Sequence, residues 1–283
     1  MIEKMRKPLF NGISIITIVL NGESLIEETI KSVIFQENVP IEYIIIDGGS
    51  TDGTLEKIKK YQSKIDLLIS EPDKGIYSAI NKGIKLANND LIGLIHCGDF
   101  YEPDTLQTVY NAFKENHADV IYGDIKIIEE YSIQNIVHYN KANHNLLQKQ
   151  MSIFHPATFV ARECYLKYGL YNTNYKITAD YELILNLYLR NVKFEYIPQV
   201  LADFRKGGIS GSRLNLLFKE NFLIRKKLLG LKSALIYIFS EYPIHIYHSL
   251  RKSCIESIVG KNNYFKIKQR LYNRKSLTGN KKI

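Results

Sequence analysis

The amino-acid sequence predicts an α/β fold with a mainly parallel sheet that carries helices on both faces. Apolar runs typical of buried strands alternate with amphipathic, helix-like segments three times before residue 100. The connections between them are short, as expected of strand–helix–strand units. Each apolar run also ends at a polar or acidic residue. Ligands of such sheets bind beyond the carboxyl ends of the strands, so this edge is where we expect a site.

The first part of the chain supplies the predicted parallel strands and their helices. Strands are expected at Ile13–Leu20, Ile41–Ile46, Ile65–Ile69 and Leu91–Ile95, because these runs are almost wholly apolar. Helices are expected at Glu23–Gln36, from a cap at Ser50 or Thr51 through Tyr61, and over Ile76–Ala87. This strict alternation favours parallel pairing of the strands.

After Asp99 the pattern changes to shorter and more alternating segments. Asp104 is expected to cap a helix that runs through Asn116, and Thr178 to cap a helix through Arg190. Further strands, in part antiparallel, are expected at Asp119–Tyr122, Lys126–Glu129, Ile133–Tyr139, Phe154–Ala161, Val192–Ile197 and Val200–Phe204. From Arg213 onward the chain is predicted to be helical. We therefore expect one large domain over residues 1–212 and a helical, basic extension over 213–283.

The positive charge is concentrated at the C-terminal end of the sequence. The net charge is +9, and residues 251–283 hold ten lysines and arginines but only one acid, Glu256. The rest of the chain is thus neutral in sum. A basic tail favours an anionic surface, with membrane lipid ahead of nucleic acid, and no nucleic-acid partner is expected. The alternative is a solvated tail without a partner.

The cysteines and the hydropathy pattern bear on the compartment. Cys97, Cys164 and Cys254 are few and far apart, which argues against a disulfide framework and for a reducing compartment. No run reaches the roughly 20 apolar residues that a membrane-spanning helix needs. We therefore expect a cytoplasmic protein that lies peripherally on the inner face of the plasma membrane.

Acidic residues at the strand ends are the first candidates for chemistry. Asp99 follows the fourth strand and suits a Mg²⁺ or Mn²⁺ ion that also binds phosphates, or else it stabilises a turn. Asp47 suits a nucleoside base or ribose, or else it holds the turn at Gly48. Asp73 and Lys74 open a helix and suit a diphosphate, or else they cap that helix.

Asp180 is the candidate for proton transfer. It lies in the first turn of the helix Thr178–Arg190, where the helix N-terminus favours the ionised carboxylate. An ionised carboxylate can take a proton from a sugar hydroxyl as that oxygen attacks. The alternative is an Asp that only complements the helix dipole. Glu182 is expected on a different side of the same helix.

Two further segments suit the acceptor side of a site. His155 stands before Pro156 and is either a pocket residue or a core histidine. The segment Phe204–Ser210 combines Arg205 with Gly207 and Gly208, which suits a mobile lid over phosphates, or else a basic surface loop.

Several of these motifs, in this order, resemble family 2 glycosyltransferases with the GT-A fold. The resemblance extends over about residues 12–230 and is nearest to the colanic-acid and exopolysaccharide type of bacterial transferase. The motifs that carry it are Ser14–Asn21, Gln36, Ile45–Thr54, Ser70–Tyr77, Asn81–Ile84, Gly98-Asp99, Ala179–Glu182 and the Phe204–Ser210 loop.

This resemblance implies an inverting transferase that moves a sugar from a nucleotide-sugar donor, expected to be a UDP-sugar, to a lipid-linked or oligosaccharide acceptor in surface polysaccharide biosynthesis. The nucleotide-binding half would be residues 12–99 and the acceptor half 100–212. Asp99 would bind Mg²⁺ or Mn²⁺, and Asp180 would be the catalytic base. The donor side would comprise Ile18, Val19, Leu20, Asp47, Asp73, Lys74, Asn81, Gly98 and Asp99, and the acceptor side or lid His155, Glu182, Arg205, Gly207 and Gly208.

The sequence departs from the family pattern at three places. Cys97-Gly98-Asp99 stands where the DxD motif has two acids, Gly48 replaces a second Asp, and Pro156 stands where this branch often has Gln. Two other functions remain open from the residues alone. One is a sugar nucleotidyltransferase, although Leu20–Glu23 lacks the glycine-rich, basic loop of that chemistry. The other is a non-catalytic module that binds a sugar nucleotide or a membrane.

Overall fold

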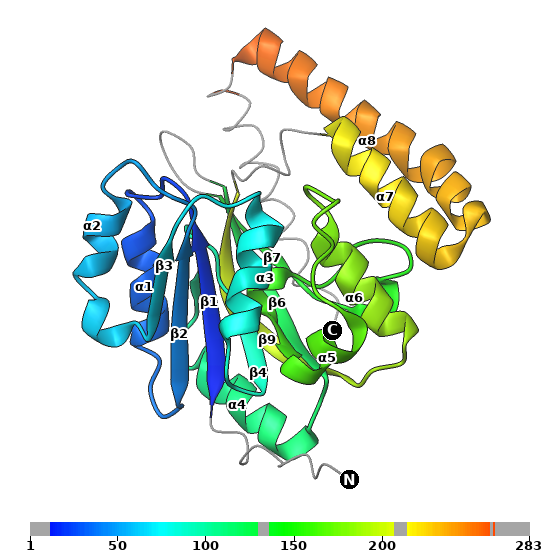
Figure 1. Ribbon diagram of the computed structural model, residues 1–283. Coiled ribbons are helices and arrows are strands. Elements are labelled where there is room, and N and C mark those ends of the chain that lie inside the picture. Colours follow the sequence, from blue (N-terminus) through cyan, green and yellow to red (C-terminus); the bar gives the residue numbers. More distant parts are fainter. Residues whose placement is uncertain (1–11, 130–135, 207–213, 261–262, 264–283) are drawn as a thin grey trace, which may run out of the picture. The chain divides into compact units, whose positions relative to one another are not determined.

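Four parallel strands form one half of the sheet. They are β1 (Ile13–Val19), β2 (Ile41–Asp47), β3 (Leu67–Ser70) and β4 (Leu91–Leu94), and the pairs β1–β2, β1–β4 and β2–β3 are all parallel. The computed structural model in Figure 1 describes residues 12–129, 136–206, 214–260 and 263. Within them the strand order is β3-β2-β1-β4-β8-β6-β9-β5, and β7 pairs with β6. The predicted α/β fold with a mainly parallel half is confirmed.

Helices cover both faces of this parallel half. The helices are α1 (Ile26–Ile34), α2 (Thr54–Lys59) and α3 (Ile76–Leu86), with a short 3₁₀ turn at Gln62–Lys64. Ile13, Ile15 and Val19 of β1 share one core with Ile26, Ile30 and Val33 of α1. Ile16 points to the other face, where a Cβ added to Gly83 of α3 would lie only 2.5 Å from its side chain. Gly83 therefore lets α3 approach β1 closely.

The second half of the sheet is largely antiparallel. Strand β8 (Thr158–Ala161) pairs antiparallel with both β4 and β6 (Val120–Glu129), and β5 (Phe100–Tyr101) with β9 (Phe194–Lys206). The other elements of this part are α4 (Thr105–Asn116), β7 (Ile136–Asn140), α5 (Arg162–Tyr168) and α6 (Ala179–Leu189), with 3₁₀ turns at His144–Leu146 and His155–Ala157.

Several predicted strands were wrong in their extent. The strands expected at Asp119–Tyr122 and Lys126–Glu129 form one strand, β6, because the core residues Ile121 and Ile125 continue the same alternation. The two strands expected around Pro198 also form one strand, β9, since the fixed φ of proline is compatible with an extended chain. Phe154–Ala161 is extended only from Thr158. Of the strand expected at Ile133–Tyr139, residues 133–135 lie outside the described residues.

Two of the predicted helix caps were correct in position, but none of the predicted residues caps its helix with a side-chain hydrogen bond. Helix α2 begins at Thr54, and Ser50 instead accepts a hydrogen bond from the backbone N–H of Asn21. Asp104 and Thr178 precede their helices but make no side-chain capping bond. Asp104 adopts a left-handed conformation, with φ 61°, so its side chain does not take the usual capping geometry. Tertiary contacts and local backbone geometry thus override the capping preferences of these residues.

The chain divides into two compact units. The first comprises Met1–Ile127 and Tyr139–Arg205, and the second Ile128–His138 and Lys206–Ile283. The second unit contains α7 (Leu214–Leu229) and α8 (Leu231–Val259), which pack together through Phe218, whose ring lies 5.9 Å from Tyr237 and 4.4 Å from Tyr242. Among the described helices, none is both long and apolar enough to cross a membrane. The domain boundary expected at residue 212 stays a prediction.

Candidate active site

Asp47 lies at the end of β2 and holds the loops around it. Its buried carboxylate accepts hydrogen bonds from the backbone N–H groups of Gly49 (3.2 Å) and Ser50 (3.0 Å) and from the hydroxyl of Ser70 (2.6 Å). The hydroxyl of Ser50 donates to the second oxygen. This is the turn chemistry that the sequence left open as the alternative. A contact of Asp47 with a nucleoside stays a prediction.

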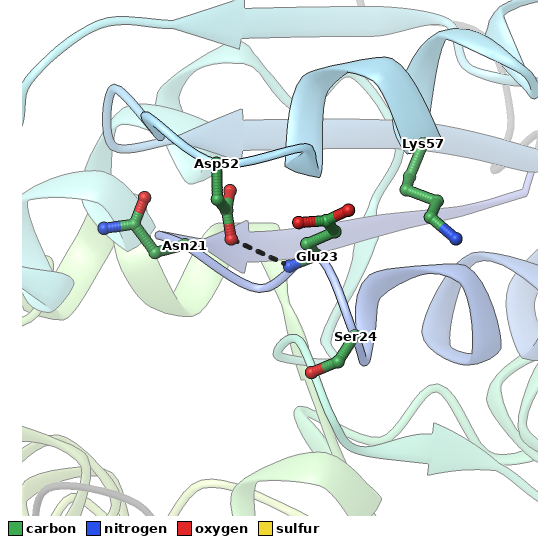
Figure 2. A pocket seen from close by; sticks show the side chains of 5 residues that line it. All are labelled: Asn21, Glu23, Ser24, Asp52 and Lys57. Carbon is green, nitrogen blue, oxygen red and sulfur yellow. Dashed lines mark hydrogen bonds between the residues drawn. The ribbon is translucent and has the colours of Figure 1, made fainter.

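The loops after β1 and β2 are joined by a polar network. Asn21 accepts a hydrogen bond from the backbone N–H of Thr51 (2.9 Å), and Asp52 accepts one from that of Glu23 (3.2 Å). A pocket of about 350 Å³ opens here, lined by Asn21, Glu23, Ser24, Asp52 and Lys57 (Figure 2). Neither Asp99 nor Asp180 lines it, so the candidate catalytic groups lie elsewhere.

The end of β1 was predicted to line the base of a nucleotide. The carbonyl of Ile18 accepts a hydrogen bond from the N–H of Cys97 (3.1 Å), and that of Val19 accepts one from the N–H of Gly48 (2.9 Å). Both side chains are buried, whereas the side chain of Leu20 is 61% exposed. Of these three residues, only Leu20 presents its side chain to solvent.

The residues predicted to bind the diphosphate, Asp73 and Lys74, precede α3, and the predicted donor residue Asn81 lies on that helix. Asp73 forms an ion pair with Lys82 (2.8 Å), while Lys74 is exposed and forms no ion pair with any described residue. Asn81 uses its amide oxygen and its amide nitrogen for the backbone of Tyr171, at 3.0 Å and 2.8 Å. Asn81 therefore ties α3 to the segment before α6, and its predicted contact with a donor stays untested.

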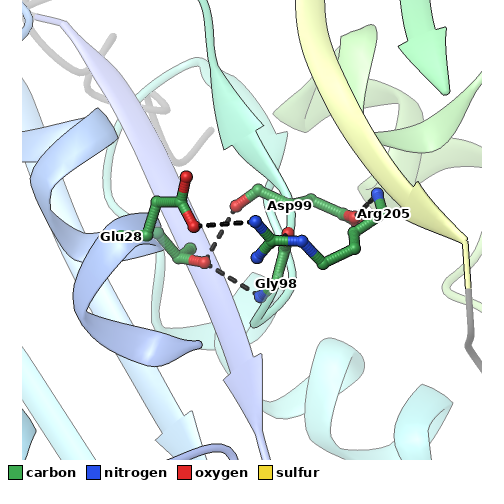
Figure 3. Close-up of polar contacts among 5 residues, drawn as sticks. Glu28, Gly98, Asp99 and Arg205 are labelled. Atoms are coloured by element: carbon green, nitrogen blue, oxygen red, sulfur yellow. Dashed lines mark hydrogen bonds and ion pairs between the residues drawn. The ribbon is translucent and has the colours of Figure 1, made fainter. Parts of the chain in front are cut away.

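The loop that carries Asp99 is fixed from two sides. Gly98 has φ +100°, a conformation that favours glycine, and it leads into the buried Asp99. The hydroxyl of Thr29 on α1 accepts from the N–H of Gly98 (3.0 Å) and donates to the carbonyl of Asp99 (2.8 Å). From β9, the backbone N–H of Arg205 donates to Asp99 Oδ1 (3.0 Å), and its guanidinium pairs with Glu28 (2.9 Å; Figure 3).

His155 is the residue that links the two candidate carboxylates. Its Nε2 lies 3.7 Å from Asp99 Oδ2. Its ring packs against His96, with ring centroids 4.6 Å apart, and against the edge-on ring of Phe204, with centroids 6.2 Å apart. His155 also lies close enough to Asp180 to lower the pKa of that carboxyl. The 3₁₀ turn His155–Ala157 thus places an imidazole beside the loop after β4, from where it also affects Asp180 electrostatically.

Asp180 is partly exposed at the start of α6, and its neighbours have opposite effects on its pKa. Its Oδ1 accepts hydrogen bonds from the N–H of Tyr181 (2.9 Å) and the hydroxyl of Tyr77 (3.4 Å). Burial raises the pKa of Asp180 above its ordinary value, while His155, Tyr181 and Tyr77 act in the opposite direction. The predicted stabilisation of the carboxylate by the helix N-terminus is thus outweighed by burial. Asp180 is thus a carboxyl whose proton affinity exceeds that of an ordinary Asp.

The structure therefore brings three predicted residues together, Asp99, His155 and Arg205, and His155 also acts electrostatically on a fourth, Asp180. Glu182 is buried two residues beyond Asp180, and its role stays a prediction. Gly207 and Gly208 lie outside the described residues. Among the residues that the structure describes, no group of three or more His, Cys, Asp or Glu side chains could hold a metal ion. A cation at Asp99 would thus depend on few protein ligands and on oxygens of the donor.

Three supporting residues escaped the sequence analysis. Thr29 has the spacing of the buried face of α1, so nothing marked it as a partner of Asp99. Glu28 is separated from Arg205 by 177 positions, and only the folded sheet joins them. Tyr77 was noted as part of a motif, without a role at Asp180.

Comparisons with known proteins identify a matching protein family and several relatives. Glycosyl transferase family 2 matches residues 14–168, which is more than half of the chain. The curated relatives include a "PGL/p-HBAD biosynthesis glycosyltransferase" of Mycobacterium tuberculosis, 26% identical over 83% of this chain and 91% of that protein. An uncharacterized glycosyltransferase of the same species is 29% identical over 71% and 78%. The colanic-acid and exopolysaccharide branch is not among the names of these relatives.

Two solved structures share the fold. S. aureus TarS in complex with UDP-GlcNAc has a TM-score of 0.64 at 19% identity, over 81% of this chain and 73% of that one. The mannosyltransferase PcManGT of Pyrobaculum calidifontis, in complex with GDP-Man and Mn²⁺, has a TM-score of 0.59 at 15% identity, over 93% and 80%. These likenesses confirm the predicted GT-A fold. With the family match, they show that the chain belongs to glycosyl transferase family 2 and is a glycosyltransferase.

Proposed function

We propose that the protein transfers a sugar from a nucleoside-diphosphate donor, a UDP-sugar in the first instance, to a hydroxyl of a lipid-linked or oligosaccharide acceptor, with inversion at the anomeric carbon. One observation carries this proposal. His155 Nε2 lies 3.7 Å from Asp99 Oδ2, after β4, and the same histidine lowers the pKa of Asp180, at the start of α6. This electrostatic link supports a site in which the donor diphosphate and the base for the acceptor serve one displacement.

Asp180 is the base of the proposed reaction. The acceptor oxygen attacks the anomeric carbon, the bond from that carbon to the diphosphate oxygen breaks, and the acceptor proton moves to Asp180. The raised pKa of Asp180 suits this task, because a carboxylate of greater proton affinity removes the proton more readily. Its partial exposure leaves room for the acceptor hydroxyl.

The residues around Asp99 would stabilise the leaving diphosphate. A divalent cation bound there would neutralise the negative charge that builds on the leaving oxygen. The Asp99 carboxylate suits such a cation because its Oδ1 is held in place by the N–H of Arg205. Lys74 is exposed ahead of α3 and would add a point charge to the phosphates. Support for this class of donor comes from the UDP-GlcNAc and GDP-Man bound by the two structural neighbours.

The acceptor is proposed to lie at an anionic membrane surface. Helix α8 exposes large apolar side chains at positions that recur every three to four residues, and Phe239 among them is 77% exposed. These are Leu231, Leu235, Ile236, Phe239, Ile246 and Tyr247. Lysines at 226, 227 and 232 flank them, and the basic tail 251–283 follows. An apolar helix face bordered by cations is typical of proteins that bind at the interface of anionic lipids.

Product analysis tests the proposed reaction. Purified protein is incubated with UDP-, GDP- and TDP-sugars in the presence of Mg²⁺ or Mn²⁺, and the released nucleotide is identified. Release of nucleoside diphosphate with at least one donor is the expected result. Pyrophosphate would instead indicate a nucleotidyltransferase, and no product with any donor would indicate a binding module. Chemical identification of the acceptor product then tests the proposed role in surface polysaccharide biosynthesis, which rests on the sequence motifs.

A further inference from the structure

We infer that His155 Nε2 and Asp99 Oδ2 together bind the divalent cation, so that His155 is a metal ligand rather than a lid residue. This inference rests on the proposed function, since the cation would act on the donor diphosphate. It also answers the question raised by the motif Cys97-Gly98-Asp99, which retains only one of the two acids of a DxD motif.

The hydrogen bonds of the two side chains leave one atom of each available to an ion. Asp99 Oδ1 is occupied by the N–H of Arg205, which leaves Oδ2 facing His155. His155 Nε2 is a buried atom without a hydrogen-bond partner among the described residues. A buried nitrogen in this state is costly unless another group binds it. A cation between Nε2 and Oδ2 would satisfy both atoms.

The separation of the two atoms suits a shared ion. Ligands at about 2.1 Å from one octahedral cation lie about 3 Å apart when adjacent and about 4.2 Å apart when opposite. The observed 3.7 Å matches neither value, so Nε2 and Oδ2 would have to approach by about 0.7 Å to take adjacent positions on one ion. The observed separation is also longer than a hydrogen bond, which disfavours a direct N–H to carboxylate bond as the reason for the pairing. An ion can therefore join the two side chains with only small side-chain movements.

Both ligands are also held in place before any ion binds. Thr29 fixes the Asp99 loop to α1, while the rings of His96 and Phe204 both pack against the His155 ring. The remaining coordination positions are left for water and for oxygens of the diphosphate. This agrees with the absence, among the described residues, of a cluster of three or more metal-ligating side chains.

A nitrogen ligand also predicts which cation is preferred. Mg²⁺ takes oxygen ligands, whereas imidazole nitrogen favours transition-metal ions. Mn²⁺ is therefore expected to bind more tightly than Mg²⁺ to the wild-type protein in the presence of UDP. His155→Phe keeps a ring beside His96 and removes the nitrogen, so it should weaken Mn²⁺ binding at least tenfold and reduce the preference for Mn²⁺ over Mg²⁺.

Pulsed electron paramagnetic resonance of Mn²⁺ tests the assignment directly. The full chain, without a histidine tag, is loaded with Mn²⁺ and UDP, and the coupling to a directly coordinated nitrogen is measured. Labelling the histidines with ¹⁵N should change this coupling in the expected isotopic ratio. We expect the signal in the wild type and in His96→Phe, and its loss in His155→Phe. Loss in His96→Phe with retention in His155→Phe would assign the nitrogen to the wrong imidazole and overturn the inference.

The wild-type measurement decides the matter even if His155→Phe does not fold. Bound Mn²⁺ without nitrogen coupling, in a protein that still releases nucleoside diphosphate, would refute the role of His155 and leave the proposed function intact. Nitrogen coupling in a protein that releases no product from any donor would support the metal site and refute the proposed function. The two failures are therefore distinguishable.

Discussion

Asp180 shows how the surroundings of one carboxyl set its chemistry. The hydroxyl of Tyr77 donates to it and favours the charged form, whereas burial favours the neutral form. Because the base must be ionised, activity should appear as the pH rises through the raised pKa of Asp180. Tyr77→Phe removes a donor to the carboxylate and should move the acidic limb of kcat/KM to higher pH, by less than about one unit for so long a bond.

The control for this shift is Tyr171→Phe. The ring of Tyr171 stacks on Tyr77 at 5.7 Å, and phenylalanine preserves that stacking. The acidic limb of kcat/KM in Tyr171→Phe should coincide with that of the wild type. An acidic limb that stays in place in Tyr77→Phe would remove Tyr77 from the account of Asp180.

Thr29 stabilises the loop that carries Asp99. Its buried hydroxyl serves two backbone groups, the N–H of Gly98 and the carbonyl of Asp99. Thr29→Val keeps the shape but leaves both groups unpaired, so the free energy of unfolding should fall by about 1–3 kcal/mol in urea denaturation. Thr29→Ser keeps the hydroxyl and should lose less. Equal losses in the two variants would mean that the methyl group, and not the hydroxyl, stabilises the loop.

At the scale of the elements, β5, β6 and β9 meet in a partly buried cluster of charges. Lys126 of β6 lies 3.5 Å from Asp203 of β9 and also pairs with Glu102, which follows β5. Burial and the neighbouring Glu102 raise the pKa of Asp203 to about 7. Although burial opposes it, the hydrogen bond from Lys126 lowers the pKa of Glu102. The two carboxyls thus retain one proton between them up to near neutral pH.

This cluster makes stability depend on pH. The folded pKa of Asp203 lies above its unfolded value, so the folded chain binds the extra proton more tightly. The resulting stabilisation is complete below the ordinary range of Asp and is lost as the pH rises to about 7. Asp203→Asn removes this titration, so the stability of the variant relative to wild type should increase from pH 4 to pH 8 in chemical denaturation. Parallel stability curves would contradict the raised pKa.

The elements also show what local sequence predicts well. The parallel strands were found because burial on both faces leaves continuous apolar runs, as in β1 and β4. The caps were less predictable, because a side chain such as Ser50 binds Asn21 and Asp47 in neighbouring segments and not the N-terminus of a helix. Helix α5 was not predicted, since Arg162–Tyr168 is too short for a helical period to stand out.

Part of the candidate site was predictable because local sequence patterns mark the ends of strands and the starts of helices. Asp47 and Asp99 follow buried strands, and Asp180 opens a helix, so each stands at a recognisable boundary. Thr29, Glu28 and the pairing of His155 with Asp99 depend on contacts between distant segments. No local pattern encodes such contacts, and only the assembled sheet reveals them.

At the scale of the whole molecule, the proposed membrane contact rests on the basic tail and on the exposed apolar side chains of α8. Truncation after Leu250 removes the excess positive charge and should reduce sedimentation with anionic liposomes. Phe239→Asp should also reduce it, because a charge then replaces an apolar side chain on α8. Phe35→Asp is the matched control, since Phe35 is 69% exposed but lies next to α1 in the other unit. Unchanged sedimentation of both test variants would contradict the membrane role.

The assignment of Asp180 as the base is tested most directly by measuring donor binding and sugar transfer in the same Asp180→Asn protein. Asparagine keeps the size of the side chain but does not take the acceptor proton. Transfer should fall by about 10²–10⁴-fold, as expected for loss of a general base, while the affinity for the nucleotide donor stays at the wild-type value. Retained transfer, or loss of donor binding together with transfer, would contradict the role of Asp180.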